Sequence, residues 1–252
     1  MQIRPYIREV QLTSDQAPDK RRYPFSIPAI AGLDRLPLHE AVTFLIGENG
    51  MGKSTLLEGI AVAYGFCPEG GGRNFRLETR ATHSELYRYL HLVKGPLAPR
   101  DGYFLRAESF YNVATYIDDL DGYPAAAPLL REAYGGKSLH EQSHGESFWA
   151  LMDNRFGPQG VYLLDEPEAA LSAGRQMAML TRIHQLVRQG CQFVISTHSP
   201  ILLAYPQAWI YQLDDQGIRR VTYDEAAPVQ ITRRFLEQSE RMMERLLGEQ
   251  ED

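Results

Sequence analysis

The 252-residue sequence has few cysteines, no long apolar run and no surplus of positive charge. Its two cysteines, Cys67 and Cys191, give neither a disulfide framework nor a metal-ligand spacing, so a reducing cytoplasm is the simplest setting. The longest apolar runs, such as AVTFLI and ILLAY, are strand-sized, whereas a spanning helix needs about 20 apolar residues. The first ten residues lack the apolar core of a secretory signal. A formal net charge of −6 is atypical of a surface that coats DNA, although a local basic patch remains compatible with it.

Strand-like and helix-like periodicities alternate along the chain, which predicts an α/β fold with a parallel or mixed central sheet flanked by helices, plus small antiparallel and helical subregions. Strands are expected at residues 6–12, 23–30, 41–46, 160–164 and 192–196, with a hairpin formed by 209–213 and 218–223. Helices are expected at residues 56–64, 146–155, 172–189 and 232–247. No internal repeat or heptad array is present.

The strand-like and helix-like periodicity is weakest between residues 66 and 159. Residues 69–72 are typical of a turn, and residues 118–137 read as a loop and insertion. Strands are expected at 86–94 and 103–107, joined by GPLAPRDG, although residues 84–93 also fit a helix.

The stretch GENGMGKST, residues 47–55, fits G-x-x-x-x-G-K-[ST] between a buried strand and a helix, which predicts a P-loop NTPase. Glycines let backbone N–H groups surround phosphate, Lys53 would reach the β- and γ-phosphates, and Ser54 would hold Mg²⁺. A chance glycine turn before a core helix is the alternative. Upstream, Tyr23 or Phe25 is a candidate to stack on adenine, with core packing as the competing role. The predicted nucleotide contacts in the loop are Gly47, Asn49, Gly50, Gly52, Lys53, Ser54 and Thr55.

A second apolar strand ends in two adjacent acids, in VYLLDEPEAALS at residues 161–172. Asp165 would bind Mg²⁺, and Glu166 would orient or deprotonate the attacking water, because metal ligation and water activation are separate tasks. A third strand, 192–196, ends in THSP with His198 at its tip. Histidine can donate to a phosphate oxygen at neutral pH, whereas a lone loop histidine is usually a surface residue.

About twenty residues before the paired acids lies QSHGES, residues 142–147, at the start of a predicted helix. A hydroxyl and free N–H groups at a helix N-terminus suit a phosphate, although Ser143 or Ser147 also fits an ordinary N-cap. In this order the motifs resemble the ATP-binding-cassette (ABC) ATPase superfamily, including its SMC-like DNA-repair branch. The resemblance covers most of residues 41–200, and Ser143, Gly145 and Glu146 match the family's LSGGQ or LSGGE signature.

The resemblance implies one ABC-type domain over residues 1–252, in which residues 66–159 form a lobe that carries the signature helix. It also implies that Ser143 and Gly145 contact the γ-phosphate of ATP bound to the opposite protomer. His198 would be the switch histidine that positions this phosphate against Glu166. The implied assembly is therefore an ATP-dependent, head-to-tail homodimer with Mg²⁺ and two ATP molecules.

Three features depart from the family pattern. Gln142 and His144 differ from the signature, and Ser172 stands where the family usually has aspartate in the loop that contacts the partner subunit. No glutamine occurs between Lys53 and Glu141, although the family has one that touches Mg²⁺ and the attacking water. Glu108 is the predicted substitute and metal ligand, with a solvated acid at a strand end as the alternative.

These observations predict an ATP-hydrolysing switch that drives a separate effector or regulatory protein, in DNA repair or in defence against foreign nucleic acid. One alternative is the nucleotide-binding subunit of a membrane transporter, for which the missing glutamine and altered signature are unfavourable. The other is an ATP-sensing scaffold with little turnover, against which the intact Glu166 and His198 argue. Direct nucleic-acid binding is left open, since the scattered basic pairs are typical of solvated faces.

Overall fold

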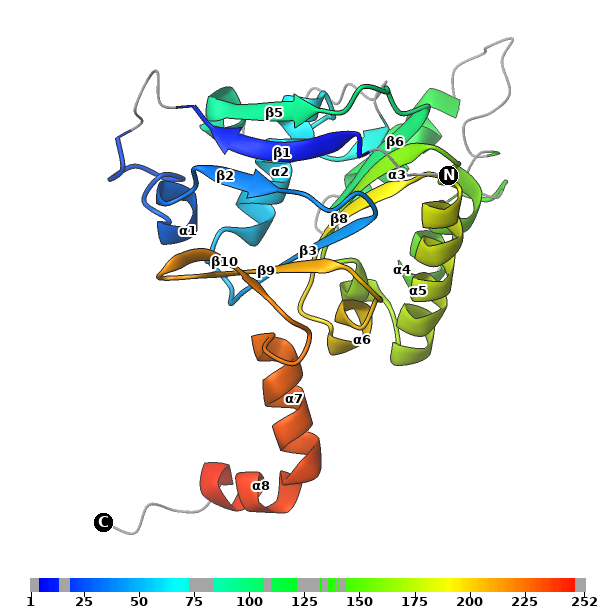
Figure 1. Cartoon of the computed structure of the whole chain (residues 1–252). Helices are drawn as coiled ribbons and strands as arrows, with labels where there is room; N and C mark the ends of the chain where they lie inside the picture. Colours follow the sequence, from blue (N-terminus) through cyan, green and yellow to red (C-terminus); the bar gives the residue numbers. More distant parts are fainter. Residues whose placement is uncertain are drawn as a thin grey trace.

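A computed structural model describes residues 5–13, 19–72, 84–106, 110–121, 132, 136–138, 140 and 144–247. It contains two sheets with helices packed around them (Figure 1). The strands are β1 (Ile7–Leu12), β2 (Arg35–Pro37), β3 (Val42–Ile46), β4 (Gly71–Gly72), β5 (Leu90–Lys94), β6 (Asp101–Arg106), β7 (Gly160–Asp165), β8 (Gln192–Ser196), β9 (Trp209–Asp214) and β10 (Gly217–Val221). The α-helices are α1 (Pro28–Ala31), α2 (Lys53–Tyr64), α3 (Phe110–Asp121), α4 (His144–Ala150), α5 (Ala173–Arg188), α6 (Pro200–Leu203), α7 (Ala227–Glu237) and α8 (Ser239–Leu247).

The larger sheet has the order β10-β9-β3-β8-β7-β6-β4 within the described part of the chain. Its five central strands run parallel, and β10 and β4 are antiparallel strands at the two edges. The smaller sheet, β2-β1-β5, is antiparallel. This mixed α/β architecture confirms the predicted fold class.

Both faces of the larger sheet are covered, which explains why its central strands are continuous apolar runs. Helix α2 lies between the two sheets, where its apolar residues pack with those of the smaller sheet (Figure 1). Helices α4, α5 and α6 cover the opposite face. In β3, Phe44 and Ile46 belong to the core on the α5 side, whereas Leu45 belongs to the core on the α2 side. The described helices include none that is both long and apolar enough to span a bilayer.

Several strands predicted from the sequence are confirmed, and one is wrong. Residues 23–30 do not form a strand: a cis peptide bond joins Tyr23 to Pro24, and Pro28 begins helix α1. Proline has no N–H to donate to a sheet but is favoured in the first turn of a helix, and two prolines in this segment therefore outweighed its aromatic and β-branched residues.

The region between residues 66 and 159 contributes strands to both sheets. The predicted turn at residues 69–72 ends in β4, which pairs with β6. Strands β5 and β6 form as predicted, but they lie in different sheets, and the open alternative of a helix is realised only in a short 3₁₀ turn, Glu85–Tyr89. Helix α3 was not predicted, and its last four residues, 118–121, fall in the segment that was expected to be a loop. Most of residues 122–137 lies outside the described residues.

Two of the predicted helices differ in detail from the structure. The helix predicted at 146–155 begins at His144 and changes at Leu151 to a π-helical turn, Leu151–Arg155. The helix predicted at 232–247 is two helices, because the backbone leaves the helical region at Gln238, where φ is −136° and ψ is 37°.

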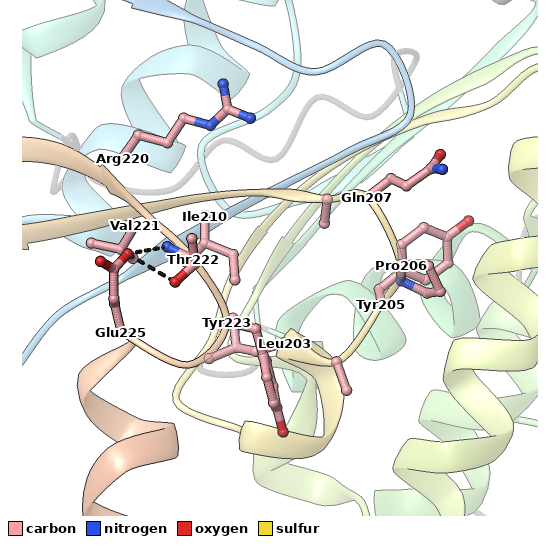
Figure 2. A pocket seen from close by; sticks show the side chains of 12 residues that line it. Leu203, Tyr205, Pro206, Gln207, Ile210, Arg220, Val221, Thr222, Tyr223 and Glu225 are labelled. Carbon is pink, nitrogen blue, oxygen red and sulfur yellow. Dashed lines mark hydrogen bonds between the residues drawn. The ribbon is translucent and has the colours of Figure 1, made fainter.

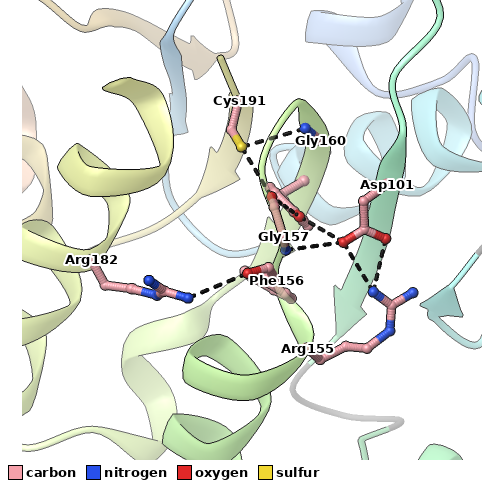
Figure 3. Close-up of polar contacts among 8 residues, drawn as sticks. Asp101, Arg155, Phe156, Gly157, Gly160, Arg182 and Cys191 are labelled. Atoms are coloured by element: carbon pink, nitrogen blue, oxygen red, sulfur yellow. Dashed lines mark hydrogen bonds and ion pairs between the residues drawn. The ribbon is translucent and has the colours of Figure 1, made fainter. Parts of the chain in front are cut away.

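A polar network at the amino end of β6 joins the π-helical turn to the sheet (Figure 3). The carboxylate of Asp101 accepts hydrogen bonds from Arg155 Nη1 at 2.8 Å, Gly157 N–H at 3.1 Å and Tyr162 O–H at 2.8 Å. Burial raises the pKa of Asp101, but the charge and hydrogen bonds of Arg155, together with the hydrogen bonds from Tyr162 and Gly157, hold the pKa below its usual value. The network fixes the end of the segment that carries the signature motif against β6 and β7.

Candidate nucleotide-binding site

Three sequence motifs meet at the carboxyl edge of the larger sheet. The register pairs Leu45 of β3 with Ser196 of β8, and Ser196 with Asp165 of β7. The residues that follow these strands are the P-loop, Glu166 and the loop that holds His198. The carboxyl ends of parallel strands are where ligands bind in open α/β sheets, so this edge is the candidate site.

The P-loop needs glycine at both of its ends. Gly47 has φ of 148°, and a Cβ there would lie 2.3 Å from the carbonyl oxygen of Leu213. Gly52 has φ of 91° and immediately precedes helix α2. No side chain caps this helix and no acid lies in its first turn. The N–H groups at the start of α2 are therefore suited to an anion such as a phosphate.

Lys53 is the buried cation of the site, and only 4% of its surface is exposed. Its Nζ donates to the carbonyl oxygen of Glu48, at 3.1 Å, so the side chain is folded back along the loop. Burial lowers the pKa of Lys53, against the opposing charges of Glu166, Asp165 and Glu168. The ammonium group thus lies among the acids with which it would share the γ-phosphate and its metal.

Asp165 and Ser54 form the candidate Mg²⁺ site. Ser54 Oγ donates to Asp165 Oδ1 at 3.0 Å. Burial raises the pKa of Asp165 to about 6, against the opposing effect of neighbouring hydroxyl groups. Among the described residues, no group of three or more His, Cys, Asp or Glu side chains is placed so that it could hold a metal ion by itself. One carboxylate and one hydroxyl suit Mg²⁺, which usually takes few protein ligands beside water and phosphate oxygens.

Glu166 and His198 face each other across the next two strand ends. Glu166 has φ of 48°, an unusual conformation for a non-glycine residue, and its N–H donates to the carbonyl oxygen of Ser196. Its Oε1 lies 3.5 Å from His198 Nε2, and 39% of the Glu166 side chain is exposed. Nε2 of His198 is buried and has no hydrogen-bond partner in the described structure. Strained backbone of this kind gathers at functional sites, and the unpaired nitrogen suits a phosphate oxygen.

Sequence reasoning missed the residue that holds the histidine loop. Glu168 Oε1 accepts a hydrogen bond from the backbone N–H of His198 at 2.6 Å. Ser199 Oγ in turn donates to Gln176 Oε1 at 2.6 Å and caps helix α6. The only sequence signal was the third acid in DEPE, two residues after Glu166. Glu168 therefore links the loop after β7 to the loop that holds His198.

The structure describes only part of the signature region. Gly145 lies in the first turn of α4, and a Cβ there would approach the carbonyl oxygen of Ala170 to 2.8 Å. Ser143 and Glu108 lie outside the described residues, so their predicted roles stay predictions. Ser172, where the resemblance led us to expect an aspartate, caps α5 by accepting a hydrogen bond from the Arg175 N–H at 3.4 Å.

The two aromatic candidates for adenine stacking occupy different environments. Phe25 is buried and contacts Tyr89 edge-on, with the ring centroids 4.8 Å apart. Tyr23 is 65% exposed, and its hydroxyl lies 3.1 Å from Thr55 Oγ1, beside the P-loop. Asn49 is exposed at the tip of the loop. Core packing is therefore the role of Phe25, whereas Tyr23 has a free ring next to the loop.

The raised pKa of Asp165 gives a stability prediction. The folded chain binds this proton more tightly than the unfolded chain, so the ionised carboxylate opposes folding above about pH 6. This opposition disappears as the pH falls below the ordinary aspartate value near 4. Without nucleotide or metal, we expect Asp165→Asn to raise the free energy of unfolding by ~2 kcal/mol at pH 7 and by little at pH 4.

Urea denaturation of both chains at the two pH values measures this difference. Asparagine keeps an acceptor for Ser54, so loss of that hydrogen bond should not mask the effect. If Asp165→Asn were less stable than the wild type at pH 7, the prediction would be wrong. The neighbouring groups would then already compensate the negative charge of Asp165 when no metal ion is bound.

No family model matches the sequence. Over 185 residues the chain is 28% identical to an uncharacterized ABC transporter ATP-binding protein of Haemophilus influenzae, covering 68% of this chain and 69% of that protein. Over 223 residues it is 28% identical to the vitamin B12 import ATP-binding protein BtuD of Yersinia enterocolitica, covering 78% and 80%. Among solved structures, cbiO1 of Clostridium perfringens has a TM-score of 0.47 at 15% identity, over 97% of this chain and 100% of that one. The two sequence relatives support the ABC ATPase superfamily.

Proposed function

We propose that this ABC-type chain binds Mg²⁺ and ATP at the carboxyl edge of its sheet and hydrolyses the γ-phosphate. The observation that carries the proposal is the arrangement of Lys53, the Ser54–Asp165 pair and the Glu166–His198 pair around one edge. These pairs supply the separate tasks of phosphoryl transfer, which depends mostly on positioning and charge stabilisation.

Each residue has one task in this mechanism. Lys53 and the N–H groups at the start of α2 bind the β- and γ-phosphates. Ser54 and Asp165 would hold Mg²⁺, which neutralises charge on the phosphate oxygens when bound. Glu166 orients the attacking water and accepts its proton, while His198 donates a hydrogen bond to the γ-phosphate. Glu168 keeps the His198 backbone in place for this contact.

The second half of the site comes from another copy of the chain. Gly145 lies in the first turn of α4, and Ser143 precedes that helix in the sequence; both would contact the γ-phosphate bound to the opposite protomer. Two ATP molecules are then buried in the interface, so association depends on ATP through mass action. Hydrolysis removes the shared γ-phosphate and lets the pair separate.

Mixing two defective chains tests this head-to-tail arrangement. Lys53→Ala removes the P-loop half of a site, and Ser143→Arg blocks the signature half. Each variant alone should be inactive, whereas the mixed dimer holds one intact site and should regain phosphate release. Absence of activity in the mixture, with both variants folded, would refute the shared site.

The curated relatives favour the transporter reading over DNA repair or defence, because both are named as transporter or import ATP-binding proteins. We therefore propose that the partner driven by hydrolysis is a separate membrane chain. Co-purification of the ATP-bound protein from solubilised membranes tests this reading. Recovery with nucleic acid and no membrane chain would favour the SMC-like switch expected from the sequence.

Tyr23 gives a prediction about the base. If its exposed ring stacks on adenine, Tyr23→Ser should weaken ATP binding about tenfold or more, since stacking on an aromatic ring contributes ~1–3 kcal/mol. Tyr23→Phe keeps the ring, loses only the Thr55 contact and should bind nearly as tightly as the wild type. Titration with a fluorescent ATP analogue measures both. Equal affinity for the serine and phenylalanine variants would exclude stacking.

A further inference from the structure

A second polar contact joins α2 to the sheet beside the Ser54–Asp165 pair. Glu58 of α2 accepts a hydrogen bond from Arg106 Nη1 of β6 at 2.7 Å, and the two side chains are only 9% and 19% exposed. Glu58 follows Ser54 by four residues, which places both on one face of the helix, about 6 Å apart along its axis. The proposed hydrolysis uses neither Glu58 nor Arg106, so this largely buried ion pair has no role assigned above.

Arg106 lies directly beside Asp165. The two residues end β6 and β7, and they pair in register. Neighbouring strands are about 4.8 Å apart, and residues in register on parallel strands point to the same face of the sheet. Both side chains reach α2, Asp165 through Ser54 and Arg106 through Glu58. The two contacts are therefore adjacent polar links between one helix and two strand ends.

The positive charge of Arg106 acts on the candidate metal ligand. Burial raises the pKa of Asp165, and neighbouring hydroxyl groups and the charge of Arg106 oppose that rise. Because arginine stays charged in proteins, Arg106 would repel a cation that is bound by Asp165. Glu58 contacts the guanidinium group and offsets its charge. The pair thus places one charge of each sign close to the expected Mg²⁺ site.

Further contacts hold the pair in place. Glu58 Oε1 accepts a hydrogen bond from the backbone N–H of Ser84 at 2.9 Å, so both carboxylate oxygens are hydrogen bonded. Arg106 Nη1 also donates to the carbonyl oxygen of Pro68 at 3.3 Å. Charges that are partly buried are screened by salt much less than exposed charges. A change of one charge in this pair is therefore felt at the metal site.

We propose that the Glu58–Arg106 pair sets how strongly Mg²⁺ and nucleotide favour each other's binding. Arg106 attracts phosphate and opposes the metal ion, whereas Glu58 has the two opposite effects. The two side chains act through the electric field at the Ser54–Asp165 pair, so they are positioning residues and not catalytic residues. The inference rests on the proposed function, since it requires that Ser54 and Asp165 hold Mg²⁺ beside a phosphate.

The test compares the affinity of the full chain for ADP in Mg²⁺ with its affinity for ADP in EDTA. ADP is not hydrolysed, and without a γ-phosphate it should not hold the proposed dimer together. The ratio of the two affinities measures the coupling between metal and nucleotide. A substitution that only loosens the fold weakens both affinities alike and leaves this ratio unchanged. Isothermal titration supplies both affinities without any measurement of turnover.

The two single substitutions should move this ratio in opposite directions. Metal-free ADP carries more negative charge than its Mg²⁺ complex, so its affinity responds more strongly to a change of charge in the site. Glu58→Gln should therefore lower the ratio at least threefold, and Arg106→Gln should raise it at least threefold. The double variant restores the balance of charge and should have a ratio within about twofold of the wild type. Arg106→Lys keeps the positive charge and should behave like the double variant.

The controls remove charges of both signs away from the nucleotide edge. Arg220 and Glu225 line a pocket of about 700 Å³ beside the amino end of β9 (Figure 2). Arg220 lies over the ring of Trp209, which pairs with Thr43 near the start of β3, whereas the P-loop follows the end of β3. Asp101 is a partly buried acid at the other end of β6, about 16 Å away along the strand. Arg220→Gln, Glu225→Gln and Asp101→Asn should all keep the wild-type ratio.

The direction of the shifts decides between an electrostatic and a purely structural role. If Glu58→Gln and Arg106→Gln shift the ratio in the same direction, or leave it unchanged, the inference is overturned. Shifts of equal size in the three controls would overturn it as well. If Arg106→Gln does not fold, a lowered ratio in Glu58→Gln with an unchanged ratio in Arg106→Lys supports the inference, and any other combination overturns it. A wild-type chain that binds neither ADP nor ATP would refute the proposed function itself, and the inference falls with it.

Discussion

A Glu166→Gln chain is expected to bind ATP and Mg²⁺ as the wild type does and to hydrolyse ATP about 10²–10⁴-fold more slowly. Glutamine has nearly the same size and can still hold the water molecule, but it cannot accept the water's proton. Glu166 is the acid best placed for this task, because its strained backbone directs it toward His198 rather than into the protein. The substitution should therefore trap the ATP-bound dimer.

Phosphate release measures the turnover, and sedimentation with ATP measures the trapped dimer. Glu40→Gln is a suitable control, since Glu40 is an exposed carboxylate before β3 and has no part in the proposed site. The control should hydrolyse ATP at the wild-type rate and should not accumulate a dimer. Normal turnover by Glu166→Gln would remove Glu166 from the role of general base and leave only a positioning role.

Lys53→Ala should weaken ATP binding by at least 100-fold. The side chain is buried among Glu166, Asp165 and Glu168, and without its charge these acids would face the triphosphate uncompensated. Hydrogen bonds to charged groups contribute ~1.5–3 kcal/mol each, and a loss of about 2.7 kcal/mol corresponds to 100-fold. Ser54 and Asp165 remain in this variant, but in the proposed mechanism they would act on phosphate only through the metal.

Isothermal titration with ATP and Mg²⁺ measures the loss directly. Lys20→Ala removes an exposed lysine and should leave the affinity unchanged. A stability measurement must accompany the titration, because removing a buried cation from three acids also changes the folded state. Undiminished affinity in a folded Lys53→Ala chain would contradict the P-loop assignment.

The parts of the site that the sequence predicted are those whose geometry is local. A buried strand, a glycine turn and a helix follow one another in residues 41–64, so the P-loop could be built from its own segment. The strands ending at Asp165 and Ser196 are apolar on both faces, which marks them as central parallel strands. Because such strands end at one edge, the approach of Asp165 to Ser54 followed from topology.

The parts that were missed depend on contacts between distant segments. Nothing local to Glu168 indicates that it holds the backbone of His198, thirty residues away. Alternation identified β5 and β6 as strands but could not show that they belong to different sheets. The aromatic pattern of residues 23–30 predicted a strand because two prolines, which remove backbone donors, were given too little weight.

The close approach of Leu213 to Gly47 makes the P-loop depend on the hairpin of β9 and β10, which follows much later in the chain. During synthesis every recognisable motif emerges from the ribosome before the strand that braces the first of them. A chain cut after Pro200 would contain all of these motifs and still lack Leu213, against which Gly47 packs. We therefore expect the P-loop to reach its final shape only after β9 has been synthesised, which is later than the last of the motifs.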